Sequence, residues 1–428
     1  MTLDLKKALI ISSYAPPAIG GPQNLFNLLR DFPETSYCIM TSFYNIDNLS
    51  AKTDTWLKGK YIFYDNISAS GVFKTHSETT KELPSRSILN KLKHLVKRVR
   101  FLGILGGIFI IGSQIIMIVR TGIKIIKKEK IEIMLGISDY GPAMISTYLI
   151  HKITKKPYYI FLFDIYKGNF YSVFPAMLLA KIFEPKLFKN AKKIIVTNEG
   201  TKEFYTKRYG DKINDKFVVI HNSVFPEPYL EFQKSQPIHK PKPPYTILFT
   251  GKIYWPQIEA LKNLIKAVNE ISDMDIKLKI YTPSPIDYLK EIGIEESSKV
   301  KILVAPPKEM PKIQNQADIL FLPLSWNTKS PDIINTATPG KLTDYLIAGK
   351  PILIHAPSST FLVKYARNNN CAAIVDEENI EKLKIAIEKL LTDRKLAEEF
   401  IKNAQKTFFE NHDANHNSLI LQNLFKNF

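Results

Sequence analysis

The sequence predicts an α/β protein of two doubly wound domains, each with a parallel sheet covered by helices on both faces. Short apolar segments alternate with helical segments from Lys7 to Ile220, which is typical of parallel strands buried on both faces. The alternation stops in a proline-rich stretch between Pro226 and Pro244 and restarts at Tyr245. The length of 428 residues also exceeds the usual size of one domain.

The first half of the chain holds seven short apolar segments that we expect to be strands. These strands are Lys7–Ser12, Tyr37–Thr41, Tyr61–Tyr64, Ile131–Gly136, Tyr158–Phe163, Lys193–Thr197 and Phe217–Ile220, and the helices among them are Asn24–Arg30 and one from about Pro142. Residues 1–225 therefore form the expected N-terminal domain.

The second half repeats this architecture after a linker. Six prolines between 226 and 244 predict the linker. The expected strands are Tyr245–Thr250, Lys277–Tyr281, Asp318–Pro323 and Pro351–His355, and the expected helices are Gln257–Ile271, Lys341–Ala348 and Ile380–Thr392. We expect a second domain at 245–405 and a helical tail at 406–428. In such sheets ligands bind at the carboxyl ends of the strands.

The composition limits the classes of function. The chain has two cysteines, far apart, which argues against a disulfide framework or a zinc site and fits a reducing, cytoplasmic compartment. The opening apolar run is short and leads into a turn, so we expect no secretory signal. The net charge of +18 implies an anionic partner.

More than half of this charge lies in one segment, at about residues 86–130. This segment contains eleven Lys and Arg residues and a single acidic residue, Glu129. The uncharged stretch Phe101–Val119 lies between its basic residues. That stretch could span a membrane, form a buried core helix, or lie in the membrane interface with its basic flanks on anionic headgroups. The interfacial alternative is favoured, because a span would separate strands of one sheet. Nucleic acid is disfavoured, because the basic residues alternate with Leu, Ile and Val.

Two loops that follow a first strand are candidate anion sites. Gly20 and Gly21 lie between a strand and a helix, where glycines let backbone N–H groups approach an anion. Lys252, in TGKIYW, has the equivalent position in the second domain and could meet a phosphate. The alternatives are a plain turn and a solvated surface lysine.

The third candidate is the stretch TATPGKLTDYLIAGKPILIH, Thr336 to His355. Gly340 leaves the backbone open at a helix start, where Lys341 and the helix dipole would favour a diphosphate. Asp344 lies too far inside the helix to cap it well, and it could accept hydrogen bonds from a diol. The alternative is a helix with one solvated Lys and one solvated Asp.

Two carboxylates at strand ends are the candidate catalytic groups of the first domain. Asp164, in FDIYKGN, is the first choice and Asp139 the second. Either could instead be structural or bind an acceptor. The sequence contains no GxSxG elbow and no HExxH or CxxC spacing, so we expect neither that type of nucleophile nor a metal site.

At this point the sequence resembles a known family. PGKLTDYLIAGKPIL resembles the donor-site helix of retaining glycosyltransferases of family 4, which have the GT-B fold. SSYAPPAIGGPQNL resembles that family's first strand and glycine loop. KNAKKIIVTNEGTKEFYTKRYG, VVIHNSV and PPKEMPKIQNQADILFLPLS resemble later segments in the right order, so that the resemblance covers nearly the whole chain.

The resemblance implies roles for individual residues. Lys252, Lys341 and Gly340 would hold the donor diphosphate, and Asp344 would bind the ribose of the nucleotide. The other implied contacts are Gly20 and Gly21 with the donor phosphate and acceptor, and Val304, Ala305 and Pro306 with the base. The last helix would cross back onto the first domain, and neither a metal ion nor another cofactor would be needed.

The chain departs from the family pattern at three positions. The first acid of the family's pair falls at Thr336, the second basic residue of the lysine loop falls at Gln257, and the second acid is an Asp. The sugar contacts would then pass to the residues around the first position. These residues are Asn335, Thr336, Ala337 and Thr338.

The leading hypothesis is a retaining glycosyltransferase of the hexosyltransferase type, active in lipopolysaccharide or exopolysaccharide synthesis. It would move a sugar from a nucleotide-diphosphate sugar to a lipid-linked or polysaccharide acceptor. It would be peripheral on the inner face of the cell membrane, bound to the anionic surface, and would not bind nucleic acid. The alternatives are a sugar-nucleotide 2-epimerase and a non-catalytic GT-B scaffold in polysaccharide assembly.

Overall fold

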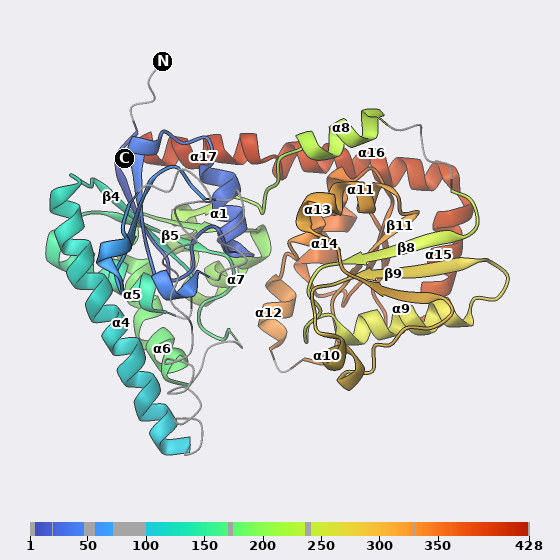
Figure 1. Ribbon diagram of the computed structural model, residues 1–428, viewed down its shortest axis with the longest axis horizontal. Helices are drawn as coiled ribbons and strands as arrows, with labels where there is room; N and C mark the ends of the chain where they lie inside the picture. The colour runs from blue at the N-terminus through green and yellow to red at the C-terminus, as the bar shows by residue number, and fades with distance from the viewer. Residues whose placement is uncertain are drawn as a thin grey trace. The chain divides into compact units, whose positions relative to one another are not determined.

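The computed structural model describes residues 5–18, 20–46, 56–71, 100–139, 141–169, 174–235, 241–328 and 330–426. The chain divides into two compact units (Figure 1). Unit 1 comprises Met1–His221 together with Asn415–Phe428, and unit 2 comprises Asn222–Ala414. Each unit contains one parallel sheet with helices between its strands, which confirms the predicted fold class.

Unit 1 has a seven-stranded sheet in the order β3-β2-β1-β4-β5-β6-β7. The strands are β1 (Ala8–Ile11), β2 (Tyr37–Thr41), β3 (Lys60–Phe63), β4 (Ile133–Ile137), β5 (Tyr158–Leu162), β6 (Lys193–Val196) and β7 (Phe217–Val219). The helices are α1 (Gly21–Leu29), α4 (Arg100–Lys128), α5 (Pro142–Thr154), α6 (Phe174–Asn190) and α7 (Glu199–Tyr209). All seven predicted strands are present, with ends shifted by at most two residues.

The last helix, α17 (Ala414–Lys426), belongs to unit 1 from Asn415 onward. Phe425 packs in the same core cluster as Leu28 of α1 and Ile39 of β2. The Tyr159 hydroxyl donates to the Leu424 carbonyl at 2.8 Å, and the Ser418 hydroxyl donates to the Leu28 carbonyl at 2.8 Å. The predicted return of the C-terminal helix to the first domain is therefore confirmed.

Unit 2 has a six-stranded sheet in the order β10-β9-β8-β11-β12-β13. The strands are β8 (Tyr245–Thr250), β9 (Ile276–Tyr281), β10 (Val300–Leu303), β11 (Ile319–Pro323), β12 (Ile352–His355) and β13 (Ala373–Val375). The helices are α8 (Glu227–Ser235), α9 (Ile258–Glu270), α10 (Ile286–Glu291), α11 (Met310–Asn315), α12 (Pro331–Thr336), α13 (Lys341–Ile347), α14 (Phe361–Asn368), α15 (Ile380–Thr392) and α16 (Arg394–Asn411). The two edge strands, β10 and β13, were not predicted.

Part of the predicted linker is a helix. α8 occupies residues 227–235 and carries Tyr229, whose side chain is buried in the core of unit 2. The proline-rich composition hid it, because Pro228 lies in the first turn of the helix, where a missing N–H has no cost. The prediction of a linker over all of 226–244 is therefore wrong.

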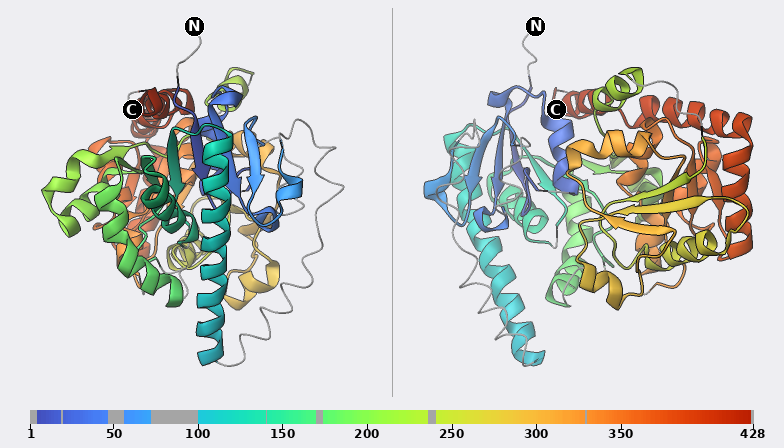
Figure 2. Two further views of the ribbon diagram at one scale, coloured as in Figure 1. Left: turned by 90° about the vertical axis from the view of Figure 1, so that its left-hand side faces the viewer. Right: turned by 45° about the vertical axis from the view of Figure 1, so that its right-hand side comes forward.

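α4 contains the apolar stretch that was expected to contact a membrane. Its 29 residues extend about 44 Å, and the helix runs well beyond the ends of the strands (Figure 2). Ile111 and Ile118 are buried, whereas Ile116 and Met117 are exposed and Phe109 is 77% exposed. The stretch from 107 to 119 is thus not a wholly buried core helix.

By length and hydropathy alone, Gly107–Lys128 could also cross a membrane. The basic residues that precede α4 in the expected membrane-associating segment fall outside the described residues. They are Arg86, Lys91, Lys93, Lys97 and Arg98.

Candidate active site

The carboxyl end of β8 and the start of α13 form the centre of the candidate site in unit 2. Gly251, which follows β8, has a φ of +106°, a region that favours glycine. A Cβ atom added to Gly251 would lie 2.7 Å from Lys341 Cε, so the glycine leaves room for the Lys341 side chain beside the loop. The Tyr345 hydroxyl accepts a hydrogen bond from the Thr250 amide at 3.0 Å. These contacts fix the lysine loop against the first turn of α13.

Lys341 is half-buried at this point. Its Nζ lies 5.0 Å from the centre of the Phe249 ring. With the Gln257 amide oriented to satisfy both of its ends, its oxygen accepts from Lys341 Nζ at 3.2 Å. No carboxylate of the described residues forms an ion pair with Lys341, and desolvation lowers the pKa of its ammonium group to about 8. A partly desolvated ammonium group without an ion-pair partner is stabilised when an anion binds beside it.

Asp344 lies in the first turn of α13, three residues after Lys341. One of its carboxylate oxygens, Oδ1, accepts a hydrogen bond from the Tyr229 hydroxyl at 2.7 Å. Burial raises the pKa of Asp344 to about 6, against the opposing effects of Tyr229 and of the Lys341 charge. The predicted phosphate and ribose residues of α13 are therefore brought to one edge of the sheet.

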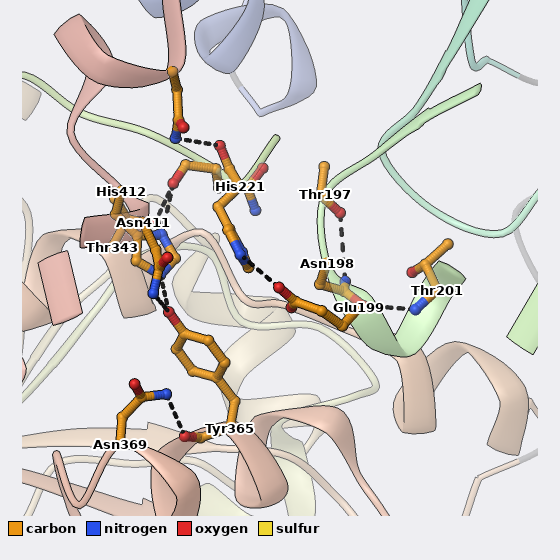
Figure 3. A network of polar contacts seen from close by, with 12 residues as sticks. Thr197, Asn198, Glu199, Thr201, His221, Thr343, Tyr365, Asn369, Asn411 and His412 are labelled. Carbon is orange, nitrogen blue, oxygen red and sulfur yellow. Dashed lines mark hydrogen bonds and ion pairs between the residues drawn. The ribbon is translucent and has the colours of Figure 1, made fainter. Parts of the chain in front are cut away.

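A second set of contacts holds α13 from its other side (Figure 3). The Thr343 hydroxyl donates to the Asn222 carbonyl at 3.2 Å. His412 contacts the same carbonyl through Nδ1 at 2.8 Å and the Tyr365 hydroxyl through Nε2 at 2.9 Å. The Asn222 side chain donates to the Thr338 carbonyl at 3.2 Å. Both α13 and the loop before it are thereby tied to residues at the ends of unit 2.

The residues predicted to contact the donor sugar lie at the end of α12 and in its connection to α13. The Thr336 hydroxyl donates to the Asp332 carbonyl at 2.7 Å, and Asn335 Oδ1 accepts from the Ser359 hydroxyl at 2.8 Å. Ala337 and Thr338 are half-buried in the connection to Gly340. The hydroxyl hydrogen of Thr336 is thus engaged within its own helix.

Two other predicted groups lie at the same edge of this sheet. Lys252 is exposed in the loop after β8. Val304 is 79% exposed, and it follows β10 together with Ala305 and Pro306. In the sheet order, β9 separates β10 from β8. The structure therefore places these residues at the same carboxyl edge of the sheet as Lys341, and their roles stay predictions.

In unit 1 the two glycines end the loop after β1. Gly20 precedes α1 with a φ of +87°, and its carbonyl accepts from the amides of Gln23 and Asn24 at 3.0 and 3.2 Å. A Cβ atom on Gly21 would lie 2.5 Å from the Phe163 ring. Both glycines thus have local structural reasons to be glycine, and their predicted contact with a phosphate stays a prediction.

Asp139 follows β4 and is held by several donors. Its carboxylate accepts from the Gly141 amide at 2.7 Å and the Ala143 amide at 3.3 Å, which caps the start of α5. The Ser13 hydroxyl, at the end of β1, also donates to it. Burial raises the pKa of Asp139 to about 6, although these hydrogen bonds lower it. With these bonds, the Asp139 carboxylate orients the loops after β1 and β4. Because its oxygens are already engaged, it is poorly placed to act as a catalytic base.

Asp164 follows β5 and is exposed. Its carboxylate has no hydrogen-bond partner in the part of the chain that the structure describes, so it is the less constrained of the two candidates. The loop that carries it is anchored one turn further on. The Lys167 amide donates to Glu184 Oε2 at 2.7 Å, and the Tyr166 amide donates to the Tyr205 hydroxyl at 2.7 Å.

Glu184 is the buried centre of this anchor. Its side chain has 0% exposure and pairs with Arg208 at 3.2 Å. The hydroxyls of Tyr209 and Tyr205 donate to it at 2.6 and 3.3 Å. The carboxylate thus joins α6, α7 and the loop after β5.

Unit 2 matches a sequence family, and the whole chain is similar in fold to several solved structures. Residues 231–407 match the sequence model of the family described as glycosyl transferases group 1. None of the curated proteins matches the chain significantly. The matched segment includes Lys252, Lys341 and Asp344. Together with the fold, the match supports a GT-B glycosyltransferase.

Several solved structures are similar over almost the whole chain. HepE from Anabaena, in complex with UDP and glucose, has a TM-score of 0.65 at 12% identity, covering 99% of this chain and 100% of that chain. Sucrose-phosphate synthase from Thermosynechococcus elongatus has a TM-score of 0.62 at 12% identity, covering 99% and 98%. A UDP-N-acetylglucosamine 2-epimerase has a TM-score of 0.54 at 14% identity, covering 98% and 95%. At such identities the likeness shows the fold.

The site of this GT-B protein includes residues that the sequence did not reveal. Tyr229 lay in the supposed linker, and the run Tyr229–Leu230 after two prolines was the available signal of a helix. Tyr345 read as an ordinary core residue of α13. Glu184 had no signal, because a single acid in a helical segment is usually solvent-exposed. Among the described residues, no group of three or more His, Cys, Asp or Glu side chains is arranged to hold a metal ion.

Proposed function

We propose that the protein is a retaining glycosyltransferase of family 4 that moves a hexosyl group from a nucleoside diphosphate sugar to a lipid-linked or polysaccharide acceptor. The observation that carries the proposal is Lys341, a half-buried cation without a carboxylate partner among the described residues. The resemblance of PGKLTDYLIAGKPIL to the donor helix of that family supports retention. HepE, which is similar in fold, was solved with UDP and glucose, so UDP is the first nucleotide to test.

The proposed chemistry depends on charge at the leaving group. When the bond between the sugar and the diphosphate breaks, negative charge grows on the diphosphate, and positive groups that are already in place stabilise it. Lys341 and Lys252 would supply this charge, with the backbone of Gly340, and the mechanism uses no metal ion or other cofactor. Asp344 would accept from the ribose. Residues 335–338 would contact the sugar and 304–306 the base.

Sugar transfer releases free nucleoside diphosphate from the sugar nucleotide, whereas epimerisation converts one sugar nucleotide into another. Incubation with UDP-sugars and GDP-sugars should release free nucleoside diphosphate, and release should increase strongly when an extract of lipid-linked and polysaccharide acceptors is added. Interconversion of the sugar nucleotide without an acceptor would instead favour the 2-epimerase alternative. Binding without either reaction would favour the non-catalytic scaffold.

We also propose that unit 1 binds the inner face of an anionic membrane. The first half of α4 exposes Ile108, Phe109 and Ile110. α6 packs against α4. On α6, Leu178 is 46% exposed and Ile182 is 45% exposed. Exposed apolar side chains on adjacent helices favour insertion into the headgroup boundary, and each nearby basic residue adds about 1 kcal/mol on an acidic leaflet.

The protein should float with liposomes that contain anionic lipid and remain at the bottom with neutral ones. Phe109→Asp should reduce flotation strongly, because it places a charge on the most exposed apolar side chain that the structure describes on α4. Ile385→Asp is the matched control, since Ile385 is 61% exposed on α15 of unit 2. Absence of the wild-type protein from the floating fraction, or equal losses in the two variants, would contradict the membrane proposal.

A further inference from the structure

Tyr229 reaches Asp344 from outside the segment that matches the family model, which begins at residue 231. Its ring is 6% exposed, and its hydroxyl donates to Asp344 Oδ1 at 2.7 Å. The other carboxylate oxygen, Oδ2, has no hydrogen-bond partner among the described residues. Because an ionised carboxylate accepts at both oxygens, Oδ2 is the oxygen of Asp344 that no described residue engages.

α8 is fixed along α13 at two points. Gln233, one turn after Tyr229, donates through Nε2 to the Ile347 carbonyl at 2.7 Å. Residues four apart lie on one face of a helix, so Tyr229 and Gln233 both face α13. The position of the Tyr229 hydroxyl is therefore set by the packing of α8 and does not depend on a mobile side chain.

The charged and titratable groups around Asp344 are Lys341 and Tyr345 on its own helix and Tyr229 on α8. Lys341 lies on the same helix and favours the ionised carboxylate, Tyr229 on α8 does the same through its hydrogen bond, and burial opposes both. A hydroxyl that donates to a carboxylate forms a strong charge-assisted bond. Removal of the Tyr229 hydroxyl would free Oδ1 and disfavour the charge.

We propose that Tyr229 is a positioning residue for the donor nucleotide: by occupying Oδ1 of Asp344, it leaves Oδ2 to accept from a single ribose hydroxyl. The inference rests on the proposed function, since it assumes that a nucleoside diphosphate binds at Lys341. It adds a specific consequence. Only one of the two ribose hydroxyls contributes to affinity through Asp344.

The test is a titration by calorimetry at pH 7 with UDP, 2′-deoxy-UDP and 3′-deoxy-UDP. For the wild-type protein, one deoxy analogue should bind about tenfold more weakly than UDP, and the other should bind about as well. Tyr229→Phe should weaken UDP binding about fivefold to tenfold. In an Asp344→Asn background the same substitution should have no further effect. If GDP binds in place of UDP, the deoxy analogues of GDP replace those of UDP.

The pH dependence separates positioning from a merely structural role. Without the Tyr229 hydroxyl the pKa of Asp344 rises above its wild-type value of about 6, so less carboxylate is ionised near neutral pH. The loss in Tyr229→Phe should therefore be larger at pH 6.5 than at pH 8. Glu231→Ala is the matched control, because Glu231 is exposed on the same helix, and it should leave affinity and its pH profile unchanged.

Three results would overturn the inference while leaving the proposed function intact. They are wild-type UDP affinity in Tyr229→Phe, an equal loss in the Asp344→Asn background, and equal losses with both deoxy analogues. Failure of the wild-type protein to bind UDP or GDP would instead overturn the proposed function, and the inference with it.

Discussion

Lys341→Met is expected to weaken nucleoside diphosphate binding by about 30- to 150-fold. The substitution keeps most of the side-chain volume next to Gly251 and removes the ammonium group. A hydrogen bond to a charged partner contributes about 1.5–3 kcal/mol, and the value should lie in the upper part of this range because Lys341 is desolvated. Isothermal titration calorimetry with UDP and GDP measures the effect.

The same substitution should not destabilise the unliganded protein. Lys341 forms no ion pair with the described residues, and the charge of Asp344 offsets only part of the desolvation cost of its ammonium group. The melting temperature of Lys341→Met should match or exceed that of the wild type. Lys389→Met is the control, because Lys389 is exposed near the end of α15 and should not affect binding. Unchanged affinity in Lys341→Met would remove this residue from the site.

Glu184→Ala is expected to lower the free energy of unfolding of unit 1 by about 3–5 kcal/mol. Removing the buried partner of an ion pair leaves the other charge uncompensated, which can have a cost of this size, although the Arg208 side chain is 25% exposed. Here the Lys167 amide and the Tyr209 hydroxyl also lose their acceptor. Urea unfolding followed by circular dichroism measures the change.

Glu203→Ala provides the comparison for this stability effect. Glu203 is exposed on α7, and its loss should change the free energy of unfolding by less than about 0.5 kcal/mol. If Glu184→Ala unfolded at the same urea concentration as Glu203→Ala, the cluster of Glu184, Arg208 and the tyrosines would not be the anchor that we describe.

The parts of the fold that could be predicted are the continuous apolar strands. β2 and β8 have the predicted limits, because each is a run of five or six apolar or β-branched residues between polar loops. β13 has three residues, and β10 includes a lysine. Edge strands of this kind are half-exposed and short, so their hydrophobic pattern is weak.

The site was predictable where a single segment carries it. Lys341 and Asp344 lie on one turn of α13, and the glycine after β8 is visible in TGKIYW. Tyr229 and Glu184 were not predictable. Each acquires its role from partners on other elements, such as Asp344 for Tyr229 and Lys167 for Glu184. No local pattern encodes those contacts.

The most direct test of the central claim is a thermal-shift titration of the wild-type protein with UDP, GDP and their sugar derivatives. The claim is that the carboxyl edge of unit 2 binds a nucleoside diphosphate through Lys341. A ligand at 100 times its Kd stabilises the folded state by about 2.7 kcal/mol. We predict that at least one of these nucleotides raises the melting temperature of the wild type saturably, and that at the same concentration it stabilises Lys341→Met by less than about 1 kcal/mol. No shift with any of them, or equal shifts in the two proteins, would contradict the claim.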